Sequence, residues 1–427
     1  MVYIVQPGDT VFSIAASFSV SSDRLRYDNQ LGAEDTLVVG QALLVLIPEI
    51  IHQVQPGDTA FSIASQYEIS VRELLQRNPF LTQNAQSEIF LVPGQFLIIR
   101  YTDSPTDETA LEGYAYPFIR PNVLRETLPF LRALYIFSYG FTLEGTLIEP
   151  PGADRLLREA KAFGVDPILV LTPLTASGTF NSNLIVALLE NETLKEQIID
   201  QLISLSLEKG YTGIDVDFEF IPEENRDAYT TFVARLAEAA HQNGLTVSVA
   251  VPPKTSADQR GLLYEGIDYG GLGAVADQVL LMTYEWGYTY GPPMAVAPIP
   301  NVRRVVEYAL TEIPANKIFL GIPNYAYDWP LPFVRGTTAA TTIGNAQAVD
   351  IARANGAVIE YDEQSQAPFF TYNAGGTERE VWFEDVRSIQ AKFDLIRKYG
   401  LAGGGYWNLM RPFRANWVMA GAEFDLE

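Results

Sequence analysis

The chain of 427 residues contains no cysteine and only two histidines, His52 and His241. The absence of cysteine excludes disulfides, thiolate metal sites and a cysteine nucleophile. With two histidines, neither a Ser-His-Asp triad nor a zinc site built from several imidazoles is expected. The sequence therefore predicts no metal site.

Positive charge and long apolar runs are also scarce. The chain has 29 Lys and Arg against 52 Asp and Glu, a net charge of −23, so nucleic acid and anionic membranes are poor partners. No run of 18 apolar residues occurs, so we expect no membrane span. The N-terminus lacks a basic segment followed by an apolar core. We therefore expect no secretory signal peptide and a protein that is cytoplasmic at synthesis.

The most informative stretch runs from Thr212 to Glu219 and reads T-G-I-D-V-D-F-E. It is short and β-prone, and Asp215, Asp217 and Glu219 occupy every second position. Side chains alternate between the two faces of a strand, so the three carboxylates share one face. The apolar residues between them can pack on the other face. Neighbouring carboxylates on a buried strand repel one another and lose solvation, a pattern typical of sites that do chemistry.

A repeat opens the chain. Val5–Thr10 returns as Val54–Thr59, and Phe12–Ala15 returns as Phe61–Ala64, in both cases 49 residues later. Each copy reads as strand, helix, helix, strand. In each copy Pro-Gly-Asp predicts a turn, with the aspartate (Asp9 or Asp58) as helix N-cap. The two copies resemble LysM modules, which bind glycans that contain N-acetylglucosamine. Two modules imply avidity for a polymer, and the alternative is a pair of structural domains without ligand.

The repeat divides the chain into predicted domains. We expect one module at residues 1–48, a second at 50–100, and a linker at 101–110 because that stretch is polar and contains proline. From residue 111 to 427, β-type runs alternate with helical patterns. The expected strands lie near 112–116, 133–139, 167–172, 212–219, 245–251, 278–285, 317–323 and 402–407. This α/β alternation predicts a (β/α)8 TIM barrel, with a small insertion at about 330–384.

The barrel segment resembles glycoside hydrolase family 18. Residues 212–219 are similar to the D-x-x-D-x-D-x-E signature of that family, with Thr212 in place of the first aspartate. The departure falls at the deepest position, where we expect it to matter least. Met282-Thr283-Tyr284 is similar to the M-x-Y motif of the family, and Gly405-Tyr406-Trp407 to its tryptophan floor.

The resemblance implies a retaining mechanism in which the substrate's own 2-acetamido oxygen is the nucleophile, without metal or cofactor. Glu219 would be the acid and base, Asp217 would hold the acetamido N–H, and Asp215 would share a proton with Asp217. Tyr284 would donate to the acetamido oxygen, and Trp407 would form the floor under the sugar. Further expected substrate contacts are Tyr406, Glu285, Trp286, Met282, Tyr139 and Asn324.

The two modules ahead of such a barrel resemble the spore cortex-lytic N-acetylglucosaminidases of spore-forming bacteria. That resemblance implies hydrolysis of β-1,4 N-acetylglucosaminyl bonds in cortex peptidoglycan fragments during germination. It also implies a location in the spore coat or on the spore surface, with coat proteins as candidate partners. Two alternatives remain: a chitinase, and a non-catalytic glycan-binding or coat-structural protein. Glu219, the expected acid, is present and favours an enzyme.

Overall fold

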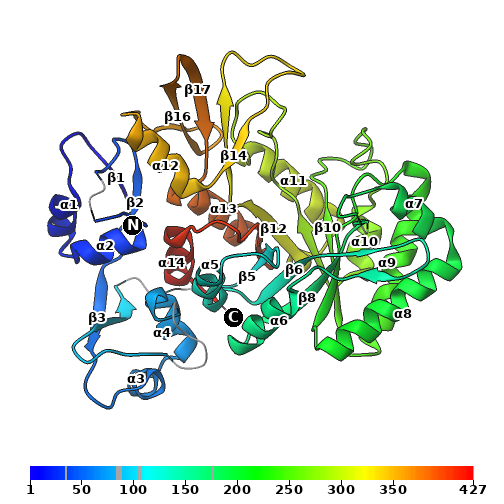
Figure 1. Cartoon of the computed structure of the whole chain (residues 1–427), viewed down its shortest axis with the longest axis horizontal. Coiled ribbons are helices and arrows are strands. Elements are labelled where there is room, and N and C mark those ends of the chain that lie inside the picture. The colour runs from blue at the N-terminus through cyan, green and yellow to red at the C-terminus, as the bar shows by residue number, and fades with distance from the viewer. Residues whose placement is uncertain (34–35, 83–88, 103–104, 106, 176, 427) are drawn as a thin grey trace.

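The structure is a computed structural model that describes residues 1–426 except 34–35, 83–88, 103–104, 106 and 176. Two small units (blue in Figure 1) lie beside a large barrel with a smaller sheet above it. The first unit contains β1 (Val2–Ile4), α1 (Val11–Phe18), α2 (Ser22–Asp28) and β2 (Ala42–Leu44). The second contains β3 (Pro48–Gln53), α3 (Ala60–Gln66), α4 (Val71–Arg77) and β4 (Phe96–Tyr101). Each unit closes with an antiparallel strand pair, so the βααβ order read from the repeat is confirmed.

The helix that follows each Pro-Gly-Asp turn begins one residue later than expected. Thr10 and Thr59 are the N-caps, and each accepts a hydrogen bond from the backbone N–H three residues on. Asp9 and Asp58 instead close the turn, where Asp9 accepts a hydrogen bond from the N–H of Gln6 at 2.7 Å. The expected aspartate caps are therefore wrong, because these carboxylates are already used by the preceding turn.

Eight parallel strands of the described chain close into a barrel, which confirms the predicted TIM fold. The sheet order around the barrel follows the chain: β5 (Asp107–Ala115), β6 (Ala133–Phe141), β8 (Asp166–Leu171), β9 (Gly213–Val216), β10 (Thr246–Val251), β11 (Gln278–Leu281), β12 (Ile318–Pro323) and β18 (Gly403–Trp407). The covering helices include α6 (Ala153–Ala162), α8 (Glu192–Lys209), α9 (Arg226–His241), α11 (Ile299–Glu312), α13 (Val386–Tyr399) and α14 (Arg414–Glu423).

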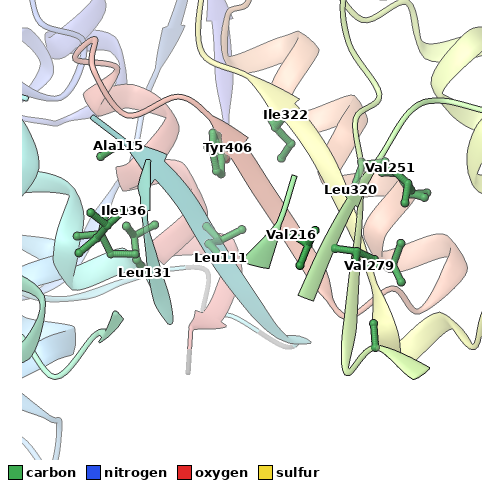
Figure 2. Close-up of a cluster of buried hydrophobic side chains, with 14 of the residues drawn as sticks. Leu111, Ala115, Leu131, Ile136, Val216, Val251, Val279, Leu320, Ile322 and Tyr406 are labelled. Carbon is green, nitrogen blue, oxygen red and sulfur yellow. The ribbon is translucent and has the colours of Figure 1, made fainter. Parts of the chain in front are cut away.

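Strand alternation separates two apolar regions in the barrel. Residues such as Leu111, Ile136 and Val216 point outward and pack under the helices in the largest hydrophobic cluster (Figure 2). The inner face of the strands carries a smaller cluster that includes Tyr114 and Phe137. Burial of the outer cluster favours folding. Polar side chains such as Asp215 lie beside the inner cluster, where Tyr114 donates to Asp215 at 3.0 Å.

A second sheet interrupts the chain between β12 and α13. It consists of β13 (Ala326–Pro330), β14 (Thr341–Ile343), β15 (Glu360–Asp362), β16 (Ala367–Ala374) and β17 (Thr377–Trp382), with α12 (Asn345–Ala354) beside it. All pairings are antiparallel, in the order β14-β13-β17-β16-β15. This insertion stands above the barrel (Figure 1).

Both modules pack against other parts of the chain. The backbone of Val39 in the first module accepts a hydrogen bond from the N–H of Ile359 in the insertion at 2.9 Å. The Arg414 guanidinium at the start of α14 stacks on Tyr27 at 3.8 Å and pairs with Glu126. Arg72 in the second module donates to the carbonyl of Pro129 at 2.9 Å. Within the described residues, no helix combines the length and apolarity needed to cross a bilayer.

Candidate active site

The cavity of about 580 Å³ at the carboxyl ends of the barrel strands is the candidate active site. In a TIM barrel this end carries the catalytic residues, because the loops that follow the strands converge there. Strand β9 ends at Val216, so it is shorter than the expected 212–219. Asp217 and Glu219 follow directly on the loop, and both line the cavity. The adjoining Phe220 has a φ of +60°, which marks a sharp change of chain direction.

Asp215 lies below the cavity, inside the barrel, and is fully buried. Its Oδ1 is 2.6 Å from the Ser248 hydroxyl on β10, and its Oδ2 accepts a hydrogen bond from Tyr114 on β5 at 3.0 Å. Burial raises the pKa of Asp215 to about 7, against the two hydrogen bonds, which act to lower it. Near neutral pH this carboxyl is therefore poised between its protonated and ionised forms.

Asp217 and Glu219 form the cavity-facing end of the carboxylate row. Burial, followed by the charges of Glu219 and Asp215, raises the pKa of Asp217 well above its ordinary value. Burial, followed by the charge of Glu285, raises the pKa of Glu219. Asp217 Oδ1 is buried, and within the described part of the chain it has no hydrogen-bond partner. This oxygen is free to accept a hydrogen bond from a ligand, while Glu219 retains a proton to higher pH than an ordinary glutamate.

Side chains from β11 and β18 complete the cavity beside these carboxylates. Met282, Tyr284 and Glu285 follow the end of β11, and Trp407 ends β18. The Trp407 ring packs edge-on against Phe137 at 4.8 Å between centroids, which orients its face. Burial, followed by the charge of Asp217, raises the pKa of Tyr284 well above its ordinary value. Tyr284 therefore remains a hydroxyl donor throughout the ordinary pH range.

Glu285 is held from the inserted sheet. It accepts hydrogen bonds from the hydroxyls of Tyr325 at 3.3 Å and Tyr327 at 3.2 Å. Its backbone φ of +65° is unusual for a residue with a side chain. The insertion thus helps to position one wall of the cavity.

Four residues expected to contact substrate do not line the cavity. Tyr139 is fully buried in the outer cluster, and its hydroxyl is 2.6 Å from that of Tyr211. An irregularity in the pairing of β6 with β8 precedes Tyr139 and breaks the strict alternation of side chains. Tyr406 points outward with the same cluster (Figure 2), and its hydroxyl donates to Asn416 at 2.8 Å.

Asn324 and Trp286 are also outside the lining. Asn324 is buried, and its amide donates to the carbonyls of Asn408 and Arg411, both at 2.9 Å. Trp286 packs against the outer cluster. None of these four side chains lines this cavity, since strand-end position alone does not show which way a side chain points, and their expected role as substrate contacts stays a prediction.

Sequence reasoning missed most of the aromatic lining. Tyr114, Tyr116, Phe137, Phe180 and Phe220 line the cavity together with Pro173, Pro252 and Pro253. Part of this lining carried a signal, because Tyr114 and Tyr116 lie two residues apart in the strand expected near 112–116, although β5 itself ends at Ala115. The loop residues carried none, since their approach to the cavity depends on the path of the chain between elements.

The geometry suits attack on a glycan. Aromatic rings, a carboxyl whose pKa burial raises and a buried acceptor oxygen meet in one cavity, and sugar recognition and general acid catalysis use such groups. Within the described residues there is no group of three or more His, Asp or Glu side chains that could hold a metal ion.

Two family descriptions match the sequence. Residues 175–411 match glycosyl hydrolases family 18. Residues 3–45 and 52–100 each match the LysM domain. The two LysM matches correspond to the βααβ units. The family 18 match includes the carboxylate row.

Similar proteins extend the match to the full chain. The cortical fragment-lytic enzyme of Bacillus subtilis (strain 168) is 38% identical over 435 residues, which cover 100% of this chain and 98% of that protein. The crystal structure of the Bacillus cereus spore cortex-lytic enzyme SleL is 34% identical, with a TM-score of 0.83 over 100% of this chain and 98% of that chain. A chitinase structure from Chromobacterium violaceum is 25% identical, with a TM-score of 0.68, and covers 73% of this chain and 98% of that chain.

Proposed function

This chain belongs to glycoside hydrolase family 18 and carries two N-terminal LysM domains, and from that premise we propose that it cleaves β-1,4 N-acetylglucosaminyl bonds in spore cortex peptidoglycan fragments. The observation that carries the proposal is the pair formed by Asp217 and Glu219. Among the described residues, Asp217 Oδ1 is buried without a hydrogen-bond partner, and burial raises the pKa of Glu219 beside it. Full-length similarity to cortex-lytic enzymes of Bacillus species supports cortex as the substrate and the spore as the place of action.

In the proposed mechanism the substrate supplies its own nucleophile. Glu219 donates a proton to the glycosidic oxygen as the C1–O bond breaks, and the acetamido carbonyl oxygen forms a new bond to C1. Asp217 accepts the acetamido N–H and stabilises the resulting oxazolinium cation. Glu219 then takes a proton from water as water attacks C1, which restores the acetamido group and retains the anomeric configuration.

The remaining cavity residues hold the sugar. Tyr284 donates a hydrogen bond to the acetamido oxygen, and its raised pKa keeps that proton available. Trp407 lies under the sugar ring. Asp215 shares a proton with Asp217, so the two titrate as a pair. The LysM domains bind the same polymer, which raises the local concentration of cleavable bonds.

The first experiment is mass spectrometry of the products formed from purified cortex fragments and from chitin oligosaccharides. Glu219→Gln should lower kcat by about 10²- to 10⁴-fold because it removes the general acid. Glu224→Gln is the matched control, since it makes the same change at an exposed glutamate five residues later. We expect products with N-acetylglucosamine at the reducing end from the wild type and from the control.

Three outcomes would contradict this proposal or its parts. Faster cleavage of chitin than of cortex would make the protein a chitinase, a reading that the Chromobacterium violaceum structure supports for the barrel alone. No cleavage of either substrate, with binding retained, would assign a binding or coat-structural protein. Hydrolysis of a glucoside that lacks the acetamido group would overturn the substrate-assisted mechanism.

A further inference from the structure

The two LysM domains build the same turn before their last strand. We call residues 36–41 the first turn and residues 90–95 the second turn. The N–H of Val38 donates to the side chain of the glutamine three residues later at 3.2 Å, and the N–H of Val92 does the same at 3.2 Å. A glycine in each turn donates to the valine that precedes the Pro-Gly-Asp turn, at 2.9 Å and 2.8 Å. Val38 and Val92 are therefore equivalent positions, and each turn lies beside the Pro-Gly-Asp turn of its own domain.

The two valines have opposite surroundings. Val38 is 4% exposed and belongs to the hydrophobic cluster of the insertion, together with Ile359 and Phe370. Val92 is 63% exposed, and Phe90, two residues before it, is 68% exposed. The first turn therefore completes the core of the insertion, whereas the second turn leaves two large apolar side chains uncovered. Apolar side chains that are exposed together mark binding surfaces more often than single ones do.

Polar contacts reinforce the docking of the first turn. The carbonyl of Thr36 accepts a hydrogen bond from Arg353 Nε on α12 at 2.7 Å, and the carbonyl of Val39 accepts one from the N–H of Ile359 at 2.9 Å. Among the described residues, no group outside the second domain donates a hydrogen bond to the second turn, and a Cβ on Gly94 would meet nothing within 4 Å. Figure 1 shows the first domain beside α12 and the second domain farther from it.

The open turn suits a sugar polymer. Phe90 and Val92 place apolar side chains beside the polar backbone of the turn, and the apolar faces of pyranose rings pack on such side chains. The adjoining Pro-Gly-Asp turn leads into α3, where Phe61 is 74% exposed, and its counterpart Phe12 on α1 is 76% exposed. At this position the two domains do not differ. The net charge of −23 favours an uncharged glycan over an anionic partner.

We propose that the second LysM domain carries the polymer binding of the pair through the second turn, and that the first domain is an intramolecular clamp on the insertion. The inference rests on the proposed function, in which a glycan polymer is the ligand of these domains. One docked turn and one open turn leave a single polymer site outside the barrel, so the gain in affinity expected from two linked modules is absent. The clamp also bears on the cavity, because the insertion that it holds positions Glu285.

The test measures retention of full-length protein on insoluble chitin and on purified cortex peptidoglycan. All proteins carry Glu219→Gln, so that the polymer is not consumed and the barrel contributes equally to each. Phe90→Ser combined with Val92→Ser removes the exposed apolar side chains of the second turn and should raise the Kd for both polymers about tenfold. Retention equal to that of the parent protein would overturn the proposal.

Phe12→Ser and Phe61→Ser are the matched pair that separates the two domains. They make the same change at equivalent and equally exposed positions, each next to its own Pro-Gly-Asp turn. Phe61→Ser should weaken retention, whereas Phe12→Ser should leave it unchanged. An equal loss in the two variants would mean that both domains bind the polymer, and this would contradict the proposal. With Glu219 intact, both variants should cleave short soluble chitin oligosaccharides at the wild-type rate.

A second readout compares the two valines in the unaltered chain. Full-length protein labelled on valine methyl groups is titrated with a soluble chitin oligosaccharide and followed by NMR, with signals assigned by their loss in Val38→Ile and Val92→Ile. The Val92 signals should shift and the Val38 signals should not, and equal shifts would contradict the proposal. If the wild type cleaves neither cortex nor chitin, the proposed function fails, yet this titration still decides which domain binds the sugar.

Discussion

At the scale of single residues, the buried carboxyl of Asp215 should set part of the pH dependence of stability. Its pKa is raised from 3.8 to about 7, so the folded state holds this proton more tightly than the unfolded state does. The stabilisation is complete below pH 4 and is lost as pH rises through 7, about 4 kcal/mol in all. Asp215→Asn should therefore become more stable relative to the wild type as pH rises. Urea unfolding at pH 5 and pH 8 measures the difference, and parallel stabilities at both pH values would contradict the assignment.

The same residues show what a sequence can predict at this scale. Strand alternation predicts one face for Asp215, Asp217 and Glu219, and the charges of Glu219 and Asp215 do act on Asp217, although β9 itself ends at Val216. The alternation rule fails for Tyr139 because the pairing of β6 with β8 is irregular just before that residue. Such an irregularity depends on two strands together, so the sequence of one strand does not reveal it. Ser248 was also out of reach, since an isolated serine on a strand says nothing about the carboxyl opposite.

At the scale of elements, every expected barrel strand exists, and the differences lie at the ends. Strand β9 stops at Val216, three residues before the expected Glu219. The N–H of Asp217 still donates to the carbonyl of Leu171 on β8 at 3.0 Å, and Glu219 lies beyond this last bond, where it lines the cavity. Hydrophobic periodicity identifies an element well, whereas its end depends on pairing with neighbours. The hydrogen bonds from the hydroxyls of Tyr325 and Tyr327 to Glu285 join elements that are far apart in the sequence, so no local sequence pattern predicts them.

Asn324 provides a prediction at the scale of elements, because it joins the end of β12 to the segment after β18. Its amide donates to two carbonyls there, and its Oδ1 accepts from Asn345 at the start of α12 at 3.4 Å. Asn324→Ala leaves those carbonyls without donors and should lower the free energy of unfolding by about 2–4 kcal/mol. KM should rise because Trp407 lies at the start of the released segment. Wild-type stability with weakened substrate binding would instead restore the direct contact expected from the sequence.

At the scale of the whole molecule, the two LysM domains are equivalent in sequence but not in surroundings. Gly40 and Gly94 occupy the same turn, and both have positive φ, +83° and +91°. A Cβ on Gly40 would lie 1.8 Å from the carbonyl oxygen of Ile359 in the insertion, whereas a Cβ on Gly94 would meet nothing within 4 Å. The repeat predicted the two folds from local sequence. It could not predict that one turn is docked, since the contact joins residues more than 300 positions apart.

This asymmetry makes Gly40→Ala and Gly94→Ala a matched pair of variants. In both variants the side chain at positive φ strains the backbone and should lower the free energy of unfolding by about 1 kcal/mol. Only Gly40→Ala should also push the first module away from the insertion and weaken the hydrogen bond from the N–H of Ile359 to Val39. Hydrogen exchange measured by mass spectrometry should then be faster at Ile359 in Gly40→Ala and unchanged in Gly94→Ala. Equal exchange in both variants would mean that the first module is not held against the insertion through this turn.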